Sequence, residues 1–324
     1  AGFFGVGVLW DLAGTDTYQL GTFGQGGGYF GHGLLIDGAG DDRYGVYTTG
    51  LGVGKPGGHG LALDLAGDDF YLCYHAADGE ELPDAYPDLL GFENQTPYAR
   101  GDSYHYSNVC QGAGWGFRHE WIDGAALWMG GLGALVDLGD GDDVHEADVF
   151  SMGMGFVYGF GFLYDGGGDD RYRTFWWGPG ASAHMGVALF LEDGGDDDLY
   201  VTRASGTWGF DWGSSWVIDR EGDDRYGGHV RYGEGYTFGH SFFLDLQGDD
   251  AYNAGPAPRS DVLFGAVRVA SPGRPQVGAF LDLGGGVDTY GDPEPGPGND
   301  TTWSLAPRGE GADPSLHLGI GIDR

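Results

Sequence analysis

One eight-residue motif, Asp-x-x-Gly-Asp-Asp-x-Tyr, recurs nine times with few changes along this chain of 324 residues. Clear copies span Asp37–Tyr44 and Asp64–Tyr71, and most neighbouring copies lie 26 to 28 residues apart. A fixed period of this length is typical of repeat architectures, in which each unit contacts only its neighbours. The repeat therefore predicts one elongated body rather than the two domains that the length alone would allow.

The second aspartate of the central pair is the constant element of the motif. It recurs as Asp16, Asp42, Asp69, Asp143, Asp170, Asp198, Asp224, Asp250 and Asp288. Strands stacked in register place equivalent residues about 4.8 Å apart, so these carboxylates are expected to form one column. Neighbouring carboxylates at that spacing repel each other by about 0.9 kcal/mol even in water. Bound cations, backbone N–H donors or strong hydration must offset this repulsion.

A short apolar run precedes the motif, as in Leu34–Ile36 and Phe242–Leu244. Such runs, bounded by glycine and a turn, fit short buried strands and are too short for helices. We predict an all-β fold: a single-domain parallel β-solenoid of roughly ten or eleven coils over residues 1–292, in which stacked coils bury one another. A β-propeller blade needs about 40–45 residues and fits the period less well.

Three segments that interrupt the period are predicted insertions, at about 76–103, 117–130 and 254–276. The first of them is rich in proline and acidic residues, which break strands. From Pro293 the sequence changes again, so 293–324 is predicted to be a C-terminal tail or cap.

The chain holds two cysteines, Cys73 and Cys110, which bracket the longest interruption. We expect a disulfide between them, with two unpaired buried thiols as the alternative. Disulfides persist in oxidising compartments, and the acidic, glycine-rich composition agrees with such a setting. We therefore predict an extracellular or cell-surface location, with the periplasm as a variant. The chain begins at Ala1 almost in register with a repeat, which suggests a processed or truncated N terminus.

The formal net charge of -34 limits the classes of partner. Nucleic acids are excluded because their binding requires lysine and arginine to neutralise phosphates. Anionic membrane surfaces are disfavoured for the same reason. No apolar run approaches the ~18 residues of a membrane-spanning helix, so no membrane insertion is expected. A protein or carbohydrate partner at a surface remains open.

The motif has two interpretations. In the first, glycine and an Asx-turn simply build a hydrogen-bonded corner. In the second, the clustered carboxylates bind Ca²⁺, which prefers oxygen ligands on flexible loops. The segments Gly38–Tyr44 and Gly166–Tyr172 resemble the Gly-x-Gly-x-Asp-x-apolar core of RTX-type calcium-binding β-roll repeats. This resemblance implies Ca²⁺ ligation by Asp42, Asp170 and their equivalents. RTX repeats recur every nine residues, whereas this motif recurs every 26 to 28 and has an aspartate in place of the first glycine.

Three other groups of residues stand out. His32, His59 and His240 each precede a motif by five residues, and His32 and His59 would be neighbours that either share a transition metal or form a polar ladder. A second group, in segment 102–128, is either an insertion over one side or the site of an enzyme. The third group is either a core cluster or a platform for sugars, and it consists of Trp176, Trp177, Trp208, Trp212 and Trp216.

We expect a non-enzymatic structural or adhesive repeat module outside the cytoplasm, stabilised by Ca²⁺. An alternative is a polysaccharide-acting β-helix enzyme, a lyase or glycoside hydrolase, that uses region 76–130. Another is a subunit that stacks end to end in a larger surface assembly.

Overall fold

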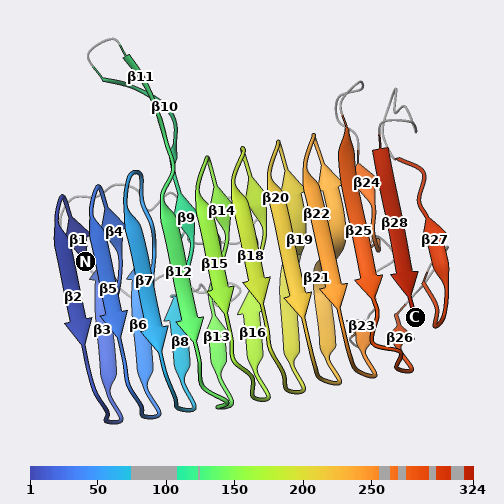
Figure 1. Cartoon of the computed structure of the whole chain (residues 1–324), viewed down its shortest axis with the longest axis horizontal. Helices are drawn as coiled ribbons and strands as arrows, with labels where there is room; N and C mark the ends of the chain where they lie inside the picture. The colour runs from blue at the N-terminus through green and yellow to red at the C-terminus, as the bar shows by residue number, and fades with distance from the viewer. Residues whose placement is uncertain (74–107, 123–124, 255–262, 269–274, 292–296, 308–316) are drawn as a thin grey trace.

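The structure, a computed structural model, describes residues 1–73, 108–122, 125–254, 263–268, 275–291, 297–307 and 317–324. Over these residues the chain is all-β, with no helix and two long sheets of mainly parallel strands (Figure 1). This confirms the predicted all-β class and the parallel pairing. Both sheets are open and end in edge strands, so the single solenoid stays a prediction.

Sheet I contains 11 strands, and all its pairings are parallel except the one between β27 and β28. In spatial order its strands are β2 (Val6–Trp10), β5 (His32–Ile36), β7 (His59–Asp64), β12 (Leu132–Asp137), β15 (Phe160–Tyr164), β18 (Val187–Leu191), β20 (Ser214–Asp219), β22 (His240–Asp245), β25 (Gln276–Asp282), β28 (His317–Asp323) and β27 (Thr302–Ser304). Apart from β27 and β28, these strands contain the apolar runs that precede the motifs, and they pair in register from one repeat to the next, as Leu34 does with Leu61.

Sheet II contains 13 strands and holds the residues that follow each motif. Its main path is β3 (Thr17–Thr22), β6 (Arg43–Thr48), β8 (Phe70–Cys73), β13 (Val144–Glu146), β16 (Arg171–Thr174), β19 (Asp198–Phe210), β21 (Arg225–Tyr236), β23 (Ala251–Ala254) and β26 (Thr289–Tyr290). Four short strands branch from this path: β9 (Gly114–Trp115), β14 (Gly155–Phe156), β17 (Ser182–Ala183) and β24 (Val267–Arg268). Two strand pairs stand apart: β1 (Gly2–Phe3) with β4 (Gly28–Tyr29), and β10 (Phe117–Ile122) with β11 (Ala125–Met129).

The core lies between the two sheets. In each motif after the first, sheet I contributes the residue two positions before the first acidic residue, because alternate residues of a strand face the same side. These residues are Leu35, Ala62, Leu135, Leu163, Phe190, Val217, Phe243 and Phe280, all buried. Sheet II contributes the motif tyrosines, of which Tyr44, Tyr71, Tyr172, Tyr226 and Tyr252 are buried. Each motif therefore lies at the turn that connects one sheet to the other.

The motif glycine is required by close stacking of these turns. Gly40 has a φ of 147°, and a Cβ on it would lie 1.4 Å from the carbonyl oxygen of Gly14 in the preceding repeat. Gly67 repeats this arrangement, with its Cβ position 1.6 Å from the carbonyl oxygen of Gly40. Only glycine combines this backbone conformation with so close an approach.

The expected disulfide is confirmed: Cys73 at the end of β8 is bonded to Cys110, with Cα atoms 6.6 Å apart. The insertion predicted at 76–103 lies outside the described residues. Within 117–130, β10 and β11 form an antiparallel hairpin that projects from the sheets (Figure 1). Only 263–268 and the flanking ends of the third insertion are described, and there β24 pairs with β21 of sheet II.

In the predicted tail, β28 pairs in parallel with β25 and so extends sheet I. The boundary predicted at 292/293 stays a prediction.

Candidate cation-binding columns

Stacking of the turns places the acidic residues of the motif in three columns. The inner column contains Asp16, Asp42, Asp69, Asp143, Asp170, Asp197, Asp224, Asp250 and Asp288. The strand-end column holds the first acidic residue of each motif, at Asp11, Asp37, Asp64, Asp137, Asp165, Glu192, Asp219, Asp245 and Asp282, and then Asp323, which pairs with Asp282. The outer column contains Asp41, Asp68, Asp142, Asp169, Asp196, Asp223 and Asp249.

Backbone N–H groups hold two of these columns together. In the inner column Oδ1 of each carboxyl group accepts the N–H of the equivalent residue one repeat earlier, as Asp69 does from Asp42 at 2.6 Å. In the outer column the donor lies one repeat later, as when Asp142 donates to Asp68 at 3.1 Å. Backbone N–H donors, which are one of the three expected ways to offset the repulsion between neighbouring carboxylates, therefore offset part of it.

The predicted column is confirmed in register for eight of its nine members, but the assignment of Asp198 is wrong. Asp197 takes that place: its Oδ1 accepts the N–H of Asp170 at 2.8 Å, and its own N–H donates to Asp224 at 2.7 Å. Asp198 begins β19 and pairs with Arg171 and Arg225, one position further along. Asp196, Asp197 and Asp198 are consecutive, so either Asp197 or Asp198 can be aligned with the constant aspartate of the motif. The motif has a tyrosine two residues after that aspartate, and Tyr200 therefore favoured Asp198, which is the wrong choice. The equal separations of 27 residues on both sides of Asp197 favour the correct alignment.

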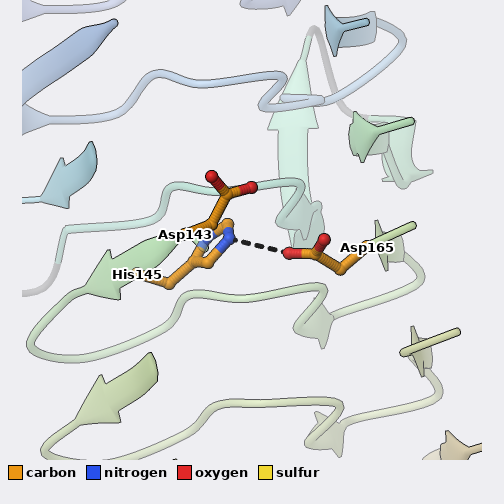
Figure 2. A group of neighbouring side chains, drawn as sticks. All are labelled: Asp143, His145 and Asp165. Atoms are coloured by element: carbon orange, nitrogen blue, oxygen red, sulfur yellow. Dashed lines mark hydrogen bonds and ion pairs between the residues drawn. The ribbon is translucent and has the colours of Figure 1, made fainter. Parts of the chain in front are cut away.

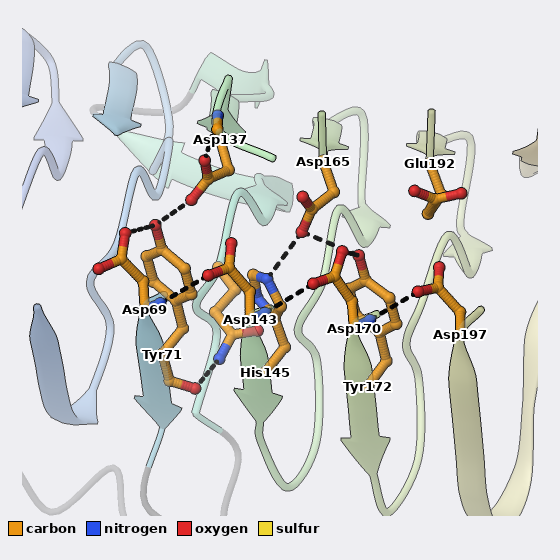
Figure 3. A network of polar contacts seen from close by, with 12 residues as sticks. Asp69, Tyr71, Asp137, Asp143, His145, Asp165, Asp170, Tyr172, Glu192 and Asp197 are labelled. Atoms are coloured by element: carbon orange, nitrogen blue, oxygen red, sulfur yellow. Dashed lines mark hydrogen bonds and ion pairs between the residues drawn. The ribbon is translucent and has the colours of Figure 1, made fainter. Parts of the chain in front are cut away.

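The motif tyrosines donate hydrogen bonds to the strand-end column. The Tyr44 hydroxyl donates to Oδ2 of Asp64 at 2.5 Å. In the next repeat the Tyr71 hydroxyl donates to Asp137 at 2.6 Å, as Figure 3 shows. Burial raises the pKa of both hydroxyl groups well above the usual range, so they remain protonated donors. The motif alone indicates only a turn for these tyrosines and the first acidic residues, and does not predict this hydrogen bond.

A tyrosine whose hydroxyl bonds a buried carboxylate should contribute more to stability than one without a partner. Tyr44→Phe removes the donor to Asp64, and leaving a buried polar group unpaired costs about 1–3 kcal/mol. Tyr158 is the matched control because its buried hydroxyl has no hydrogen-bond partner among the described residues. Because Tyr158→Phe removes an unpaired buried hydroxyl group, we expect it to leave the free energy of unfolding unchanged or to raise it in denaturant titrations. Equal costs for the two variants would contradict this role.

Several buried carboxyl oxygens lack a partner among the described residues. They are Asp37 Oδ1, Asp42 Oδ2, Asp165 Oδ1, Glu192 Oε2, Asp197 Oδ2, Asp219 Oδ1 and Asp245 Oδ1. An unpaired polar atom in the interior is rare in native proteins and calls for an explanation, such as an ion.

Burial raises the pKa of four carboxyl groups in the inner and strand-end columns, with nearby carboxylates adding to the effect. The pKa rises to about 6 for Asp42, about 8 for Asp69, about 10 for Asp197 and about 11 for Glu192. These groups therefore need either a proton or a cation to be stable at neutral pH.

The arrangement forms clusters of buried acidic residues that could hold a metal ion. Within each cluster, one ligand atom per residue lies within 4.8 Å of the others. Four of these clusters are carboxylates alone: Asp37 with Asp42 and Asp64; Asp64 with Asp69 and Asp137; Asp170 with Glu192 and Asp197; and Asp197 with Asp219 and Asp224. Each combines members of the inner and strand-end columns.

One repeat has an apolar residue in place of the tyrosine donor. Leu199 pairs with Tyr172 and Tyr226 in sheet II and so occupies the tyrosine position without a hydroxyl group. In the same repeat Glu192 replaces the usual aspartate. The neighbouring carboxylates of Asp219 and Asp197 contribute, after burial, to the raised pKa of Glu192. Among the described residues, Glu192 therefore accepts the N–H of Gly194 at 2.7 Å but no hydrogen bond from a motif hydroxyl group.

The other predicted groups form no comparable site. His32 and His59 are neighbours as expected, with ring centroids 4.9 Å apart, but both are exposed. His240 lies in a later repeat, where its register partners are Ser214 and Val277, so it has no histidine neighbour in sheet I as His32 and His59 do.

The tryptophans divide between the two interpretations. Trp176 and Trp177 are buried, which supports the core interpretation for them, and Trp177 stacks on Trp208 with centroids 4.5 Å apart. Trp212 is exposed.

Of segment 102–128, residues 102–107 and 123–124 lie outside the described residues. Cys110 is in the disulfide, and Trp115 packs on Phe156 with centroids 4.2 Å apart. Among the described residues no helix is long and apolar enough to cross a membrane. Comparisons with family models, curated proteins and solved structures give no match for this chain.

Proposed function

We propose that this chain is a single parallel β-solenoid that acts as a non-enzymatic structural or adhesive module outside the cytoplasm. In this proposal Ca²⁺ ions lie between the inner and strand-end columns and stabilise the stack of repeats. The buried carboxyl oxygens without partners, such as Asp42 Oδ2 and Asp197 Oδ2, are the observation that carries it.

The solenoid is supported by the order of the strands. The chain alternates between sheets I and II, and each repeat adds one strand to each sheet beside its equivalent in the previous repeat. The inner column runs through nine successive turns without a break, as stacked coils require. The ten strands β2 to β28 that follow one another in sheet I agree with roughly ten coils.

Calcium is supported by the chemistry of the ligands. Ca²⁺ takes six to eight oxygen ligands, and the clusters offer carboxylate oxygens from neighbouring repeats. An ion that binds several repeats at once would stabilise their stacking and neutralise the repulsion between columns. Extracellular modules bind Ca²⁺ with dissociation constants of about 10⁻⁴ to 10⁻³ M. Sites with such dissociation constants are filled only where Ca²⁺ is abundant, as it is outside the cytoplasm. The Cys73–Cys110 disulfide also favours an extracytoplasmic location.

The partner would be a protein or carbohydrate at a surface, since the charge of -34 opposes binding to nucleic acid. The enzyme alternative depends on region 76–130, much of which lies outside the described residues. The stacking-subunit alternative also stays a prediction.

Thermal unfolding with increasing Ca²⁺ at constant ionic strength tests the proposal. Because the ion would bind only the folded chain, each site should add about 2.7 kcal/mol at a hundredfold excess over its Kd. We expect the melting temperature to fall in chelator and to recover with Ca²⁺, while an equal ionic strength of NaCl restores only a part. A melting temperature that does not respond to chelator or Ca²⁺ would favour the hydrogen-bonded corner instead.

A further inference from the structure

One repeat places a histidine at the position where most repeats have tyrosine. His145 pairs with Tyr71 and Tyr172 in sheet II, and its ring lies between theirs, with centroids 4.6 and 4.9 Å away. It is fully buried. Its Nε2 lies 3.1 Å from Oδ2 of Asp165, the same relation to the next repeat that the Tyr44 hydroxyl has to Asp64 (Figure 2).

Histidine, however, brings two polar ring atoms where tyrosine brings one. Nδ1 of His145 is buried without a hydrogen-bond partner among the described residues, and so is Oδ1 of Asp165. In either tautomer, or when protonated, the imidazole leaves one polar nitrogen unsatisfied in the interior. Such an atom costs about 1–3 kcal/mol, which a tyrosine at this position would avoid. A metal ion held by Nε2 and the Asp165 carboxylate would leave Nδ1 as it is, but it would bind a carboxylate whose Oδ1 also has no partner among the described residues, and so offset this cost.

Asp143, His145 and Asp165 supply the ligands for such an ion. One ligand atom from each lies within 4.8 Å of the other two, and all three residues are buried (Figure 2). We propose that this cluster binds one transition-metal ion of the Zn²⁺ type, distinct from the calcium of the all-carboxylate clusters. Imidazole nitrogen suits zinc, cobalt and nickel, whereas Ca²⁺ takes oxygen ligands.

The geometry agrees with this assignment. Two ligands at about 2.0–2.1 Å from a tetrahedral zinc ion lie about 3.3 Å apart, close to the 3.1 Å between His145 Nε2 and Asp165 Oδ2. Outer contacts orient both carboxylates, as is usual for metal ligands. The Tyr172 hydroxyl donates to Asp165 at 2.8 Å, and the N–H of Asp69 donates to Asp143 at 2.6 Å (Figure 3).

Titration of the full chain with Co²⁺ and Zn²⁺, in excess Ca²⁺ that occupies the oxygen sites, tests this proposal. Cobalt reports its ligands through its visible absorption, and calorimetry with zinc gives the stoichiometry. We expect one tight equivalent in the wild type and none in His145→Tyr, which restores the residue of the neighbouring repeats. Asp165→Asn should weaken binding by more than the 10–100-fold that loss of an outer-shell partner costs.

His59→Ala controls for the exposed His32–His59 pair and should leave the cobalt spectrum unchanged. The reverse exchange, Tyr44→His, places an imidazole beside Asp37, Asp42 and Asp64 and should create a second equivalent. A wild type that binds no transition metal, or a His145→Tyr variant that keeps the site, would overturn the proposal. An unchanged Tyr44→His stoichiometry would show that imidazole among these carboxylates is insufficient, and would also count against it. Because Ca²⁺ is in excess throughout, these results do not depend on whether Ca²⁺ stabilises the fold.

Discussion

Without divalent cations, the protein should be more stable at about pH 5 than at about pH 8, the reverse of most acidic proteins. Burial raises the pKa of Asp42 to about 6, and those of Asp69 and Asp250 to about 8. In the unfolded chain these groups titrate near 3.9. A raised folded pKa stabilises the protein fully below the unfolded pKa, and this stabilisation is lost as pH rises through the folded pKa.

The expected loss is large because several groups titrate in the same window. Each group that stays protonated only in the folded state costs about 1.4 kcal/mol per pH unit above the unfolded pKa. Two such groups would lower the free energy of unfolding by more than about 5 kcal/mol between pH 5 and pH 8. Saturating Ca²⁺ should remove most of this slope, since the ion replaces the protons. Calcium binding near neutral pH should therefore release protons.

Denaturant titrations across this pH range measure the free energy of unfolding as a function of pH, once in chelator and once in Ca²⁺. High NaCl screens the exposed outer column and separates its contribution from that of the buried groups. If the free energy of unfolding in chelator instead rises from pH 5 to pH 8, the carboxyl groups of the inner column do not have raised pKa values, and the prediction is wrong.

Asp197→Ala and Asp198→Ala should differ strongly although the two residues are adjacent. Asp197 accepts the N–H of Asp170 and belongs to two acidic clusters. Asp197→Ala leaves that N–H unpaired in the interior and opens a cavity, at a cost of about 3 kcal/mol. In Ca²⁺ the loss of a site should add about 2.7 kcal/mol at a hundredfold excess over Kd. Asp198 lies one position outside the inner column, and its backbone pairs with those of Arg171 and Arg225, so its replacement should cost less than about 1 kcal/mol.

Asp197→Asn separates the two contributions to this cost. The amide oxygen can still accept the N–H of Asp170, but the charge is gone. We therefore expect a small cost in chelator, where the native carboxyl group is held neutral, and a larger cost in Ca²⁺. Chemical denaturation in both conditions measures this. Equal effects of Asp197→Ala and Asp198→Ala would restore the register that the sequence alone suggested.

The repeat could be predicted from sequence because its period and its apolar runs act locally. Leu34–Ile36 and its equivalents predicted short strands, and stacking of identical strands predicted parallel pairing. Which residue of each run is buried could not be decided, because all three are apolar; the structure buries Leu35. The disulfide followed from the positions of two cysteines around one interruption.

The site could be predicted only in part. Recurrence identified the inner column, but its partners come from neighbouring repeats and depend on the register of stacking. Nothing local shows that Tyr44 reaches Asp64, or that the inner and outer columns accept N–H groups from opposite directions. The exchange of tyrosine for His145 was visible in the motif, yet its significance depends on the burial of Nδ1.

A crystal structure of the full chain grown in Ca²⁺ near neutral pH, with anomalous diffraction measured at long wavelength, tests the calcium proposal most directly. We expect anomalous peaks between the inner and strand-end columns, including one within reach of Glu192, Asp197 and Asp219, where the tyrosine donor is absent. Carboxyl groups that lie in hydrogen-bonded pairs, with no anomalous density between the columns, would contradict it.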